Sequence, residues 1–562
     1  MRQKSVKNIK YYNPIITSYT AYYLSLRKHC MKKTASIIFR SALLVFLGVL
    51  LGVFISRDDL SEQLPVFSFK RADKMSKVLQ LVQYNYVDSV DVDSIEGATV
   101  HELLQKLDPH SLYLPPRQAT EVNERLEGGF TGLGIEYRLL RDTFVITQIY
   151  PGSPAAKAGL MGGAKIIAVN HKKFSGTGLT EAGIDKLLKG SKTAPLYFSA
   201  LLPGDYQTKK TFSLKPGPVA LSSLDAAYIA ADNIGYIKIS KFASTTDADF
   251  RKALADLKIQ GMKKLVLDLR GNGGGYLNTA TALADEFLPS GKLIVYTKGV
   301  HEPRTDYFAT DSGRFETGKL AVLIDEYSAS ASEILAGALQ DLDRATIVGR
   351  RSFGKGLVQQ QFPFDDGSAV NLTVARYYTP SGRSIQKSYS HGIESYRNEL
   401  AERMRKGELF SAESNLNDSL FTKQSPYRTS TGKKVFSGGG IMPDIFIPAD
   451  TTTNSVLVNQ LLEKQIFDEY VIDRMQPLLQ TYVHADQFVK NFDVTDKTFA
   501  DFLQYAGPLL KDVKLQDIKN SKPEIGTLLK AHAARFKWGN TFYYQTINSN
   551  DMALMKAITA VK

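Results

Sequence analysis

The 562-residue sequence has a single cysteine and only eight histidines, and both shortages narrow what the protein can be. Cys30 precedes the longest hydrophobic run, so no disulfide can stabilise the chain that follows, whatever its compartment. The histidines are scattered without a His-Glu-x-x-His motif, and one cysteine cannot build a thiolate cluster. We therefore expect no metal and no cofactor, and a fold held by packed hydrophobic cores.

Acidic residues are absent from the first 40 positions, where the basic residues are Arg2, Lys4, Lys7, Lys10, Arg27, Lys28, Lys32, Lys33 and Arg40. Because this segment carries most of the net charge of +13, the rest of the chain is only weakly basic. No basic stripe with interleaved aromatic residues follows, so the charge does not indicate nucleic-acid binding.

One long hydrophobic run lies at residues 35–55, and only Arg40 interrupts it. A bilayer needs about 20 apolar residues, so the run predicts a membrane segment within residues 31–60. Positive charge before it predicts an inside N-terminus, with the bulk of the chain outside the cytoplasm. No small-x-small cleavage site follows Ile55, which favours an uncleaved signal anchor over a cleaved signal peptide.

The rest of the chain divides into several parts, because 562 residues exceed one compact domain. Met31-Lys32-Lys33 resembles a signal start, which would make residues 1–30 an upstream extension of the reading frame. After the anchor we expect a helical region at 61–127, a β-rich module at 128–216, an α/β domain at 217–450 with a polar insertion at 388–434, and a mostly helical domain at 451–562. The last part carries no motif, so docking or dimerisation is all that its pattern indicates.

Strand-like runs identify the two middle parts. In the β-rich module they surround a helical segment at 180–188 and lie at 134–137, 144–149, 165–169, 196–202 and 211–214. In the α/β part, strands at 234–239, 264–269 and 320–324 alternate with helices at 246–257, 277–287 and from Glu333 onward. Such alternation predicts helices packed on a sheet.

Leu107-Asp-Pro-His-Ser111 predicts the end of a helix. Pro109 cannot continue a helix, and it disfavours helical backbone angles at Asp108. We interpret His110 in this segment as structural rather than catalytic.

Residues 320–339 predict a buried strand, a tight turn of small residues and a helix, with Ser330 in the turn. This arrangement projects the serine hydroxyl out of the sheet, and amides at the start of the helix would stabilise an oxyanion beside it. The same residues admit a structural interpretation, because Ser330-Ala-Ser-Glu333 is also a capping box. This segment alone leaves both interpretations open.

A second segment, residues 349–362, places Lys355 in a glycine loop that enters a strand-like run. Residues two and four apart share a face in an extended chain, so Lys355 and Gln359 can point to one site. A lysine can serve as the base for a serine if desolvation lowers its pKa, and a glutamine acceptor could orient the amine without adding charge. The loop nearly matches a phosphate-binding loop, but Gly356 occupies the position of the required hydroxyl residue, which counts against a nucleotide.

The run 265–275 is a strand that leads into Arg270-Gly-Asn-Gly-Gly-Gly275. Its simplest interpretation is a tight turn between strand and helix. Beside a nucleophile, Gly273 or Gly274 could supply one oxyanion amide and Ala331 the other. The sequence does not exclude a histidine base, because triad partners can lie far apart in the chain, but no motif supports one.

Gly129-Phe-Thr-Gly-Leu-Gly-Ile135 opens the β-rich module. Its glycines suit a loop whose amides capture a terminal carboxylate, and the strand after it could pair with an extended peptide. An ordinary hairpin loop is the alternative, and these residues alone do not decide between the two.

Taken in order, these motifs resemble those of the C-terminal processing peptidases, also called tail-specific proteases, over residues 70–450. The segments similar to that family are Leu107–Ser111, Phe130-Thr-Gly-Leu-Gly134, Pro151-Gly-Ser-Pro-Ala-Ala156 with Ala158-Gly-Leu160, Arg270-Gly-Asn-Gly-Gly274, Ser328-Ala-Ser-Ala-Ser-Glu333, Phe353-Gly-Lys-Gly356, Tyr378-Thr-Pro-Ser-Gly382 and Gly438-Gly-Gly-Ile-Met-Pro-Asp444. One departure is Gly162-Gly163-Ala164, where the PDZ domains of this family usually have Gly-Asp before an isoleucine.

The resemblance implies a crotonase-like α/β protease core with an inserted β-rich PDZ domain, an N-terminal helical arm and a mostly helical C-terminal domain. It implies that Ser330 is the nucleophile, Lys355 the general base and Gln359 the residue that orients the lysine. Gly132, Leu133, Gly134 and Ile135 would bind the C-terminus of a protein or peptide substrate. We expect a serine endopeptidase of the bacterial cell envelope, anchored in the inner membrane with its catalytic part in the periplasm. An adaptor protein or further copies of the same chain are the partners that this expectation includes.

Two rival hypotheses belong to other classes. A catalytically silent PDZ scaffold could use the same fold, but it would have no need of Ser330, Lys355 and Gln359 together. A hydratase or acyl-transfer enzyme could use the glycine loop on a thioester, which the PDZ-like module disfavours.

Overall fold

The computed structural model describes residues 69–562 apart from 141, 175, 177–178, 190–193, 412–426, 451–455 and 511–512. The predicted membrane run at 35–55 and residues 1–30 lie outside the described residues. Within the described ranges, no helix combines the length and the apolar character needed to cross a bilayer.

The chain forms two units, one up to Glu96 and one from Gly97 onward. Helix α2 (Phe69–Asn85) belongs to the first unit, and α3 (Val92–Gln105) begins in the first and ends in the second. The sheets and the remaining helices belong to the second unit.

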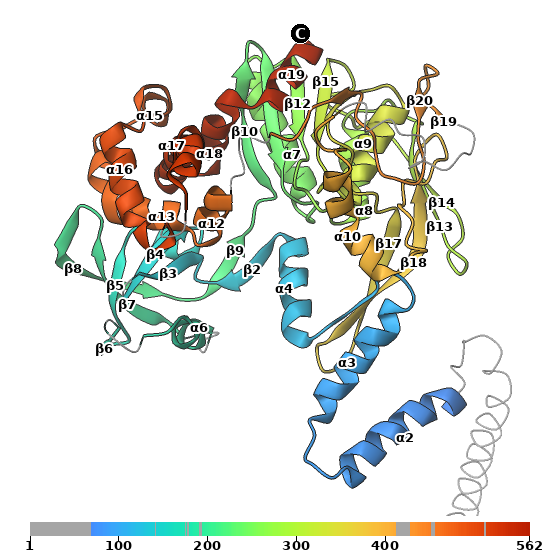
Figure 1. Cartoon of the computed structure of the whole chain (residues 1–562), viewed down its shortest axis with the longest axis horizontal. Coiled ribbons are helices and arrows are strands. Elements are labelled where there is room, and N and C mark those ends of the chain that lie inside the picture. The colour runs from blue at the N-terminus through green and yellow to red at the C-terminus, as the bar shows by residue number, and fades with distance from the viewer. Residues whose placement is uncertain are drawn as a thin grey trace, which may run out of the picture. The chain divides into compact units, whose positions relative to one another are not determined.

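A six-stranded sheet forms the centre of the second unit (Figure 1). Its order is β10 (Leu224–Ala231), β11 (Ile234–Ile239), β12 (Lys264–Asp268), β15 (Leu320–Ile324), β16 (Thr346–Gly349) and β21 (Ile445–Phe446). All neighbours from β11 to β21 are parallel, and β10 is antiparallel to β11. Parallel strands are buried on both faces, which explains why β12 and β15 read as continuous hydrophobic runs in the sequence.

Helices cover both faces of this sheet. On one face, Leu267 and Val322 join a core with the helices α7 (Thr246–Ile259), α8 (Leu277–Asp285) and α9 (Ala331–Asp341). On the other face, the alternate residues Val266 and Leu323 pack against α19 (Met552–Val561). The strands and helices predicted for this part of the sequence are therefore confirmed, although α9 begins at Ala331 rather than Glu333.

A second sheet is antiparallel and was not predicted. It joins β1 (Leu112–Leu114), β18 (Ala369–Tyr378), β13 (Leu293–Lys298) and β14 (Thr305–Phe308), and β17 (Leu357–Pro363) pairs with β18. The region expected to be helical at 61–127 contains α2, α3 and α4 (Pro116–Glu127), and the short strand β1 lies between α3 and α4. Residues 112–114 are extended because they find their partners at 369–371, far along the chain.

The β-rich module contains one sheet of order β3, β4, β5, β7 and β8, with β6 paired to β5. The bounds are β3 (Ile135–Leu140), β4 (Thr143–Ile149), β5 (Lys165–Val169), β6 (Lys172–Lys173), β7 (Leu196–Leu202) and β8 (Asp205–Leu214), with helices α5 (Pro154–Lys157) and α6 (Glu181–Lys189). The chain enters through β2 (Gly129–Gly132) and leaves through β9 (Gly217–Ala220), which pair with each other.

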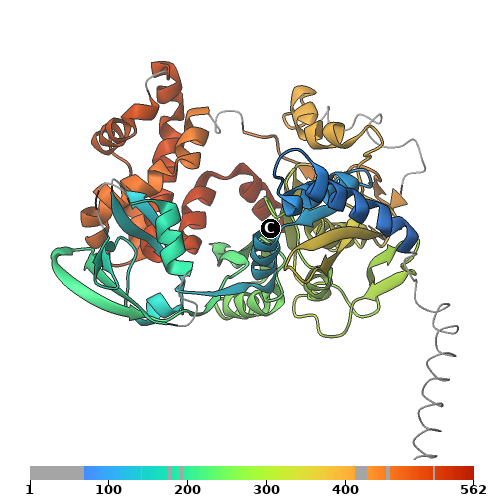
Figure 2. The ribbon, with the colours of Figure 1, turned by 90° about the horizontal axis from the view of Figure 1, so that it is seen from below.

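The C-terminal part is helical, as the sequence predicted. It contains α12 (Val456–Glu463), α13 (Ile466–Tyr470), a π-helical turn (Val471–Met475), α14 (Gln476–Gln480), α15 (Ala485–Asn491), α16 (Asp496–Tyr505), α17 (Leu515–Trp538) and α18 (Asn540–Ile547) before α19. Among these helices, α13 lies against the β-rich module (Figure 1), and the same side-by-side arrangement of module and helices is seen in Figure 2. Arg138 of β3 forms an ion pair with Glu469 of α13 at 3.3 Å.

Gly163, beside the departure at Ala164, is a second point of contact with these helices. Gly163 has φ +81°, and a Cβ atom there would lie only 2.5 Å from Nε2 of Gln476 in α14. Tyr206 donates a hydrogen bond to Oε1 of the same glutamine at 2.9 Å. A side chain at position 163 would push the Gln476 side chain out of this contact.

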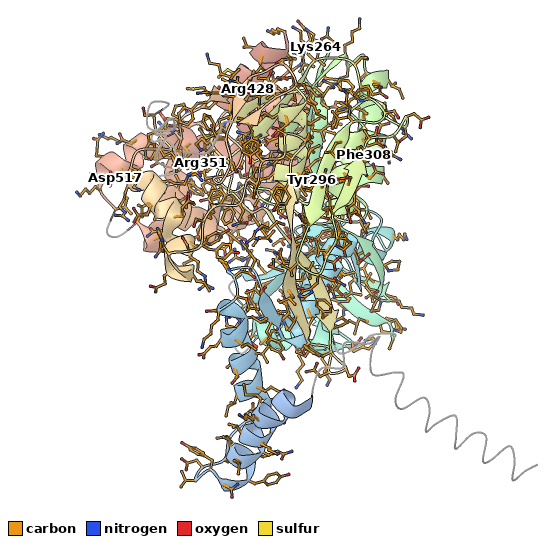
Figure 3. All side chains as sticks on the ribbon, turned by 90° about the vertical axis from the view of Figure 1, so that its right-hand side faces the viewer. Lys264, Tyr296, Phe308, Arg351, Arg428 and Asp517 are labelled. Carbon is orange, nitrogen blue, oxygen red and sulfur yellow. The ribbon has the colours of Figure 1, made fainter. Side chains whose placement is uncertain are left out.

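The insertion at 388–434 contains α10 (Ile393–Arg405) and the short strands β19 (Tyr427–Arg428) and β20 (Lys434–Val435). Arg351, labelled in Figure 3, joins this insertion to the loop that carries Lys355. Its guanidinium forms ion pairs with Glu408 at 2.6 Å and Glu399 at 3.0 Å, and both Arg351 and Glu408 are buried. The insertion therefore helps to hold the lysine loop.

Candidate active site

Two loops meet at the carboxyl edge of the central sheet. β12 and β15 are parallel neighbours, so the glycine loop after β12 and the serine turn after β15 leave the sheet side by side. Asn272, which is fully buried, ties them together: its carbonyl oxygen accepts hydrogen bonds from the Ala329 amide at 3.0 Å and the Ser332 hydroxyl at 2.8 Å. Its side-chain amide donates to the carbonyl oxygen of Ile239 at 3.0 Å.

Gly274 packs directly against the serine turn. Its φ is +106°, and a Cβ atom there would lie 2.9 Å from both the Ala329 carbonyl oxygen and the Ser330 Cβ. Its own amide donates to Oδ1 of Asn272 at 2.8 Å. Of the two amides predicted as alternatives, Gly273 or Gly274, the second is therefore already donated in this conformation, and Gly274 allows the two loops to approach.

Ser330 lies at the start of α9 with φ +56°, a conformation that non-glycine residues adopt at a cost. Its amide donates to Oε2 of Glu333 at 2.9 Å. The hydroxyl of the buried Tyr377 lies 3.1 Å from the Ser330 carbonyl oxygen and 2.8 Å from the Lys355 carbonyl oxygen. The strained serine is thus held from two sides.

Glu333 joins the serine turn to the lysine loop. It is buried, and its carboxylate accepts hydrogen bonds from the amides of Gly354 at 2.7 Å and Lys355 at 2.9 Å, and from the hydroxyl of Ser352. Burial raises the pKa of this carboxyl, and the hydrogen bonds oppose the rise. The sequence indicated Glu333 only as a helix-capping residue, because its partners in the lysine loop lie about 20 residues further on.

Lys355 lies just before β17 and faces the same pocket as Ser330. Desolvation by burial lowers the pKa of its amine from 10.5 to about 8, while the negative charges of Glu333 and Asp108 act in the opposite direction. A pKa near 8 leaves a useful fraction of neutral amine at neutral pH, as a general base requires.

The pocket has a volume of about 300 Å³, and its lining includes Ser330, Lys355, Gln359, Gly273 and Ala331. Among the residues that the structure describes, the Gly273 and Ala331 amides donate to no other group, so both are available to an oxygen bound in the pocket. The Gln359 side chain donates to the hydroxyl of Thr373 at 3.2 Å. The structure therefore brings the predicted nucleophile, base, orienting residue and two oxyanion donors to one pocket.

His110 is near this site but is not suited to be its base. Its Nε2 lies 2.7 Å from the Tyr396 hydroxyl. Burial and then the positive charge of Lys355 lower its pKa to about 3. Elsewhere in the described ranges, no three His, Cys, Asp or Glu side chains are grouped as metal ligands.

Gly132, Leu133, Gly134 and Ile135 form the turn between β2 and β3. The carbonyl oxygens of Leu133 and Gly134 accept hydrogen bonds from Ala155 and Tyr150, but in the described part of the chain their own amides have no partner. The strand β3 that follows is an edge strand of its sheet. Both features suit the capture of a terminal carboxylate with an extended tail.

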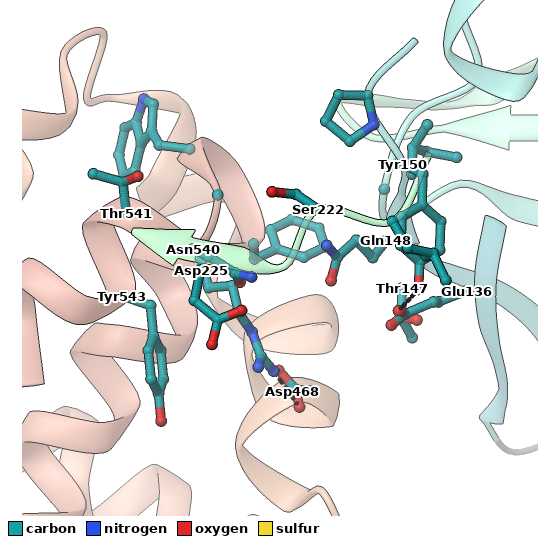
Figure 4. A pocket seen from close by; sticks show the side chains of 18 of the residues that line it. Glu136, Thr147, Gln148, Tyr150, Ser222, Asp225, Asp468, Asn540, Thr541 and Tyr543 are labelled. Carbon is teal, nitrogen blue, oxygen red and sulfur yellow. Dashed lines mark hydrogen bonds and ion pairs between the residues drawn. The ribbon is translucent and has the colours of Figure 1, made fainter. Parts of the chain in front are cut away.

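A larger cavity, of about 990 Å³, lies between the β-rich module and the C-terminal helices. Figure 4 shows side chains that line it. Glu136 and Gln148 line it from the module, and Asp468 and Tyr543 line it from the helices. Glu136 alternates along β3 with Ile135 and Tyr137, which join the module core, so this cavity lies on the other face of the sheet. It contains none of the predicted site residues.

Comparison with protein-family models gives three matches. Residues 233–395 match peptidase family S41, residues 122–197 match the PDZ domain, and residues 457–539 match a family of unknown function.

Curated relatives agree with the match to a peptidase family. The chain is 34% identical over 330 residues to the carboxy-terminal processing protease CtpB of Bacillus subtilis, covering 58% of this chain and 67% of that one. It is 35% identical over 324 residues to the carboxy-terminal-processing protease of Bartonella bacilliformis, covering 57% and 73%. A solved structure, the photosystem II D1 C-terminal processing protease, matches with 26% identity and a TM-score of 0.32, covering 68% and 91%.

Proposed function

Because the chain belongs to the carboxy-terminal processing proteases of peptidase family S41, we propose that Ser330 is its nucleophile and Lys355 its general base. The protein is a serine-type endopeptidase with a PDZ domain. The observation that carries the assignment is the Glu333 carboxylate, which accepts hydrogen bonds from the Ser330 and Lys355 amides at 2.9 Å each. Through these two hydrogen bonds, the buried Glu333 fixes the backbone of Ser330 relative to the backbone of Lys355.

In the proposed reaction, the neutral Lys355 amine takes the proton of the Ser330 hydroxyl as its oxygen attacks a peptide carbonyl. The amides of Gly273 and Ala331 stabilise the oxyanion that forms, since both face the pocket with no other acceptor among the described residues. The lysine ammonium then protonates the leaving amine, which leaves an acyl-enzyme. A water, deprotonated by the same lysine, hydrolyses the ester and restores the serine.

The substrate of this reaction is proposed to be a protein whose C-terminal tail the PDZ domain holds. Support comes from the amides of Leu133 and Gly134, which no described residue occupies, and from the unpaired edge of β3. A tail that adds to β3 as a further strand would place its carboxylate at the glycine turn.

The compartment is proposed from the sequence. The hydrophobic run at 35–55 follows a basic segment, which is typical of an anchor with the catalytic part outside the cytoplasm. We therefore place the protease at the inner membrane of a bacterial envelope, facing the periplasm.

The test is cleavage of an unfolded model protein with a free apolar C-terminus, followed by mass spectrometry of the products. The wild type should cut, while Ser330→Ala and Lys355→Ala should each be silent. Ser549→Ala and Lys556→Ala, at exposed positions, serve as matched controls and should cut like the wild type. Equal cutting by the two dyad variants would refute the assignment, and tail binding without cutting by the wild type would favour the scaffold hypothesis.

A further inference from the structure

We infer that Thr373 and Asp108 form a relay of hydrogen bonds that fixes the orientation of the Gln359 amide and so presents its carbonyl oxygen to the pocket of Lys355. The inference rests on the proposed function, because it assigns two positioning residues to the same site. It also gives a part to Leu107-Asp-Pro-His-Ser111, a segment that the proposed reaction does not otherwise use.

The relay crosses two strands and reaches a distant loop. Gln359 on β17 and Thr373 on β18 are register partners, so their side chains are neighbours. Nε2 of Gln359 lies 3.2 Å from the Thr373 hydroxyl oxygen, and that oxygen lies 3.1 Å from Oδ1 of Asp108. Asp108 lies 265 residues before Thr373 in the chain.

The direction of each hydrogen bond follows from the number of protons available. An ionised carboxylate only accepts, so the Thr373 hydroxyl must donate its single proton to Asp108. That hydroxyl can then only accept from Gln359, which must therefore present its NH₂ group to Thr373. The carbonyl oxygen of the Gln359 amide is left on the other side, free for the pocket that Gln359 shares with Lys355.

Asp108 is held firmly enough to set this direction. The residue is 7% exposed, and its carboxylate accepts hydrogen bonds from the amides of His110 at 2.8 Å and Ser111 at 2.9 Å. The Ser111 hydroxyl donates to its other oxygen at 2.6 Å. With these donors around it, the carboxylate cannot turn away from Thr373.

The orientation of the amide matters for a lysine base. A carbonyl oxygen can accept a hydrogen bond from the Lys355 amine, which orients the amine without adding a charge. An inverted amide would aim its N–H groups at the lysine, where they would compete for the lone pair that removes the serine proton.

A purely structural role is the alternative. The Thr373 amide also donates to the Ser111 hydroxyl at 3.1 Å, and β1 pairs with β18 next to it, so this segment could simply pin one strand to the sheet. If the contact were only structural, its loss would lower the stability of the fold, and any loss of catalytic rate would be the same with or without the Gln359 side chain.

The test is the rate at which a fluorophosphonate labels Ser330 in the detergent-solubilised full chain between pH 6 and 10. This reagent requires the lysine base but no peptide and no tail. Thr373→Val removes the hydroxyl and should slow labelling about tenfold, and Thr373→Ser, which keeps it, should stay within about threefold of the wild type. In a Gln359→Ala background, Thr373→Val should cause no further loss, because both changes break the same relay.

Asp108→Asn provides a second variant if Thr373→Val does not fold, and it should likewise lose its effect in the Gln359→Ala background. The variant Thr297→Val, at a buried threonine of β13 in the same sheet, is the matched control and should label at the wild-type rate. Equal slowing by Thr373→Val with and without Gln359, or no slowing at all, would overturn the relay.

The outcome separates the relay from the proposed function. If the wild type is labelled but cuts no protein, the tail-protease proposal fails and the relay is still read from labelling. If the wild type is not labelled although it is folded, the serine–lysine dyad fails and the relay falls with it.

Discussion

The glycine loop after β12 and the glycine loop before β3 are similar in composition but differ in what surrounds them. At Gly274, a Cβ atom would meet the backbone and side chain of the serine turn at 2.9 Å, and the amide is already donated to Asn272. At Gly134, a Cβ atom would meet Ser153 at 2.1 Å, but in the described part of the chain the amide of Gly134 has no partner.

The two loops therefore need glycine for the same steric reason and use their amides differently. The first loop is closed by bonds to its neighbours, which suits a site where groups must keep fixed positions during a reaction. The second loop has backbone amides without partners in the described part of the chain, and it lies beside the unpaired edge of β3, which suits a site that binds a ligand. The predictions below test whether chemistry and tail binding separate along this line.

The largest effect is expected at Gly274→Ala. The new methyl would press on Ser330, and φ +106° is unfavourable for alanine, so the nucleophile should move. We expect kcat to fall about 10²- to 10³-fold with the affinity for a tail peptide unchanged, measured by cleavage kinetics and fluorescence anisotropy. Gly271→Ala is the control, since Gly271 also has positive φ but nothing lies within 4 Å of its Cβ position.

Asn272→Ala should have the next largest effect. It removes the side-chain bonds to Gly274 and to Ile239, and it leaves buried polar groups without partners. We expect a loss of about 10- to 100-fold in kcat and about 2 kcal/mol in the free energy of unfolding, measured by kinetics and denaturant titration. A variant with normal kcat would show that the Asn272 side chain does not hold the glycine loop in its active conformation.

Gly134→Ala should affect the other loop alone. Its methyl would collide with Ser153, so the carboxylate turn should open and KM for a tailed substrate should rise about tenfold. The rate of Ser330 labelling by a fluorophosphonate should stay at the wild-type value. Gly152→Ala, with φ +71° and open space around its Cβ position, is the matched control, and slower labelling in Gly134→Ala would break the proposed separation.

The smallest difference between wild type and loop variants is expected in the pH dependence of the acylation rate. Lys355 is active as the neutral amine, so the acylation rate should rise with pH through a midpoint of about 8 and fall away below it. His110, with its pKa lowered to about 3, should add no step near pH 6.5. The midpoint should be the same in Gly134→Ala, and a midpoint of about 10 or above, the ordinary lysine range, would contradict the desolvated base.

Local patterns were enough to identify the chemical groups. Ser330 lies in a strand–turn–helix and Lys355 in a glycine loop before a strand, and both signals are contained in fewer than about 20 residues. The parallel strands of the central sheet were visible for the same reason, because burial on both faces makes each a continuous hydrophobic run.

Long-range pairing was not visible. In the sequence, residues 112–114 belong to a region with a helical pattern, and they form the strand β1 only because they pair with residues 369–371. Likewise, nothing in the sequence near Asp108 indicates its hydrogen bond with Thr373. The sequence allowed both Gly273 and Gly274 as oxyanion donors, and only the Asn272 side chain, folded back on its own loop, takes Gly274 out of consideration.

The sequence by itself thus determined which residues could do chemistry and the class of fold that carries them, because hydrophobic period, glycine placement and turn residues act over short stretches. Only the tertiary structure decided which amides are free, which way the Gln359 amide faces and how far the Lys355 pKa falls. Those properties depend on burial and on hydrogen-bond partners that come from distant parts of the chain, and no local pattern records them.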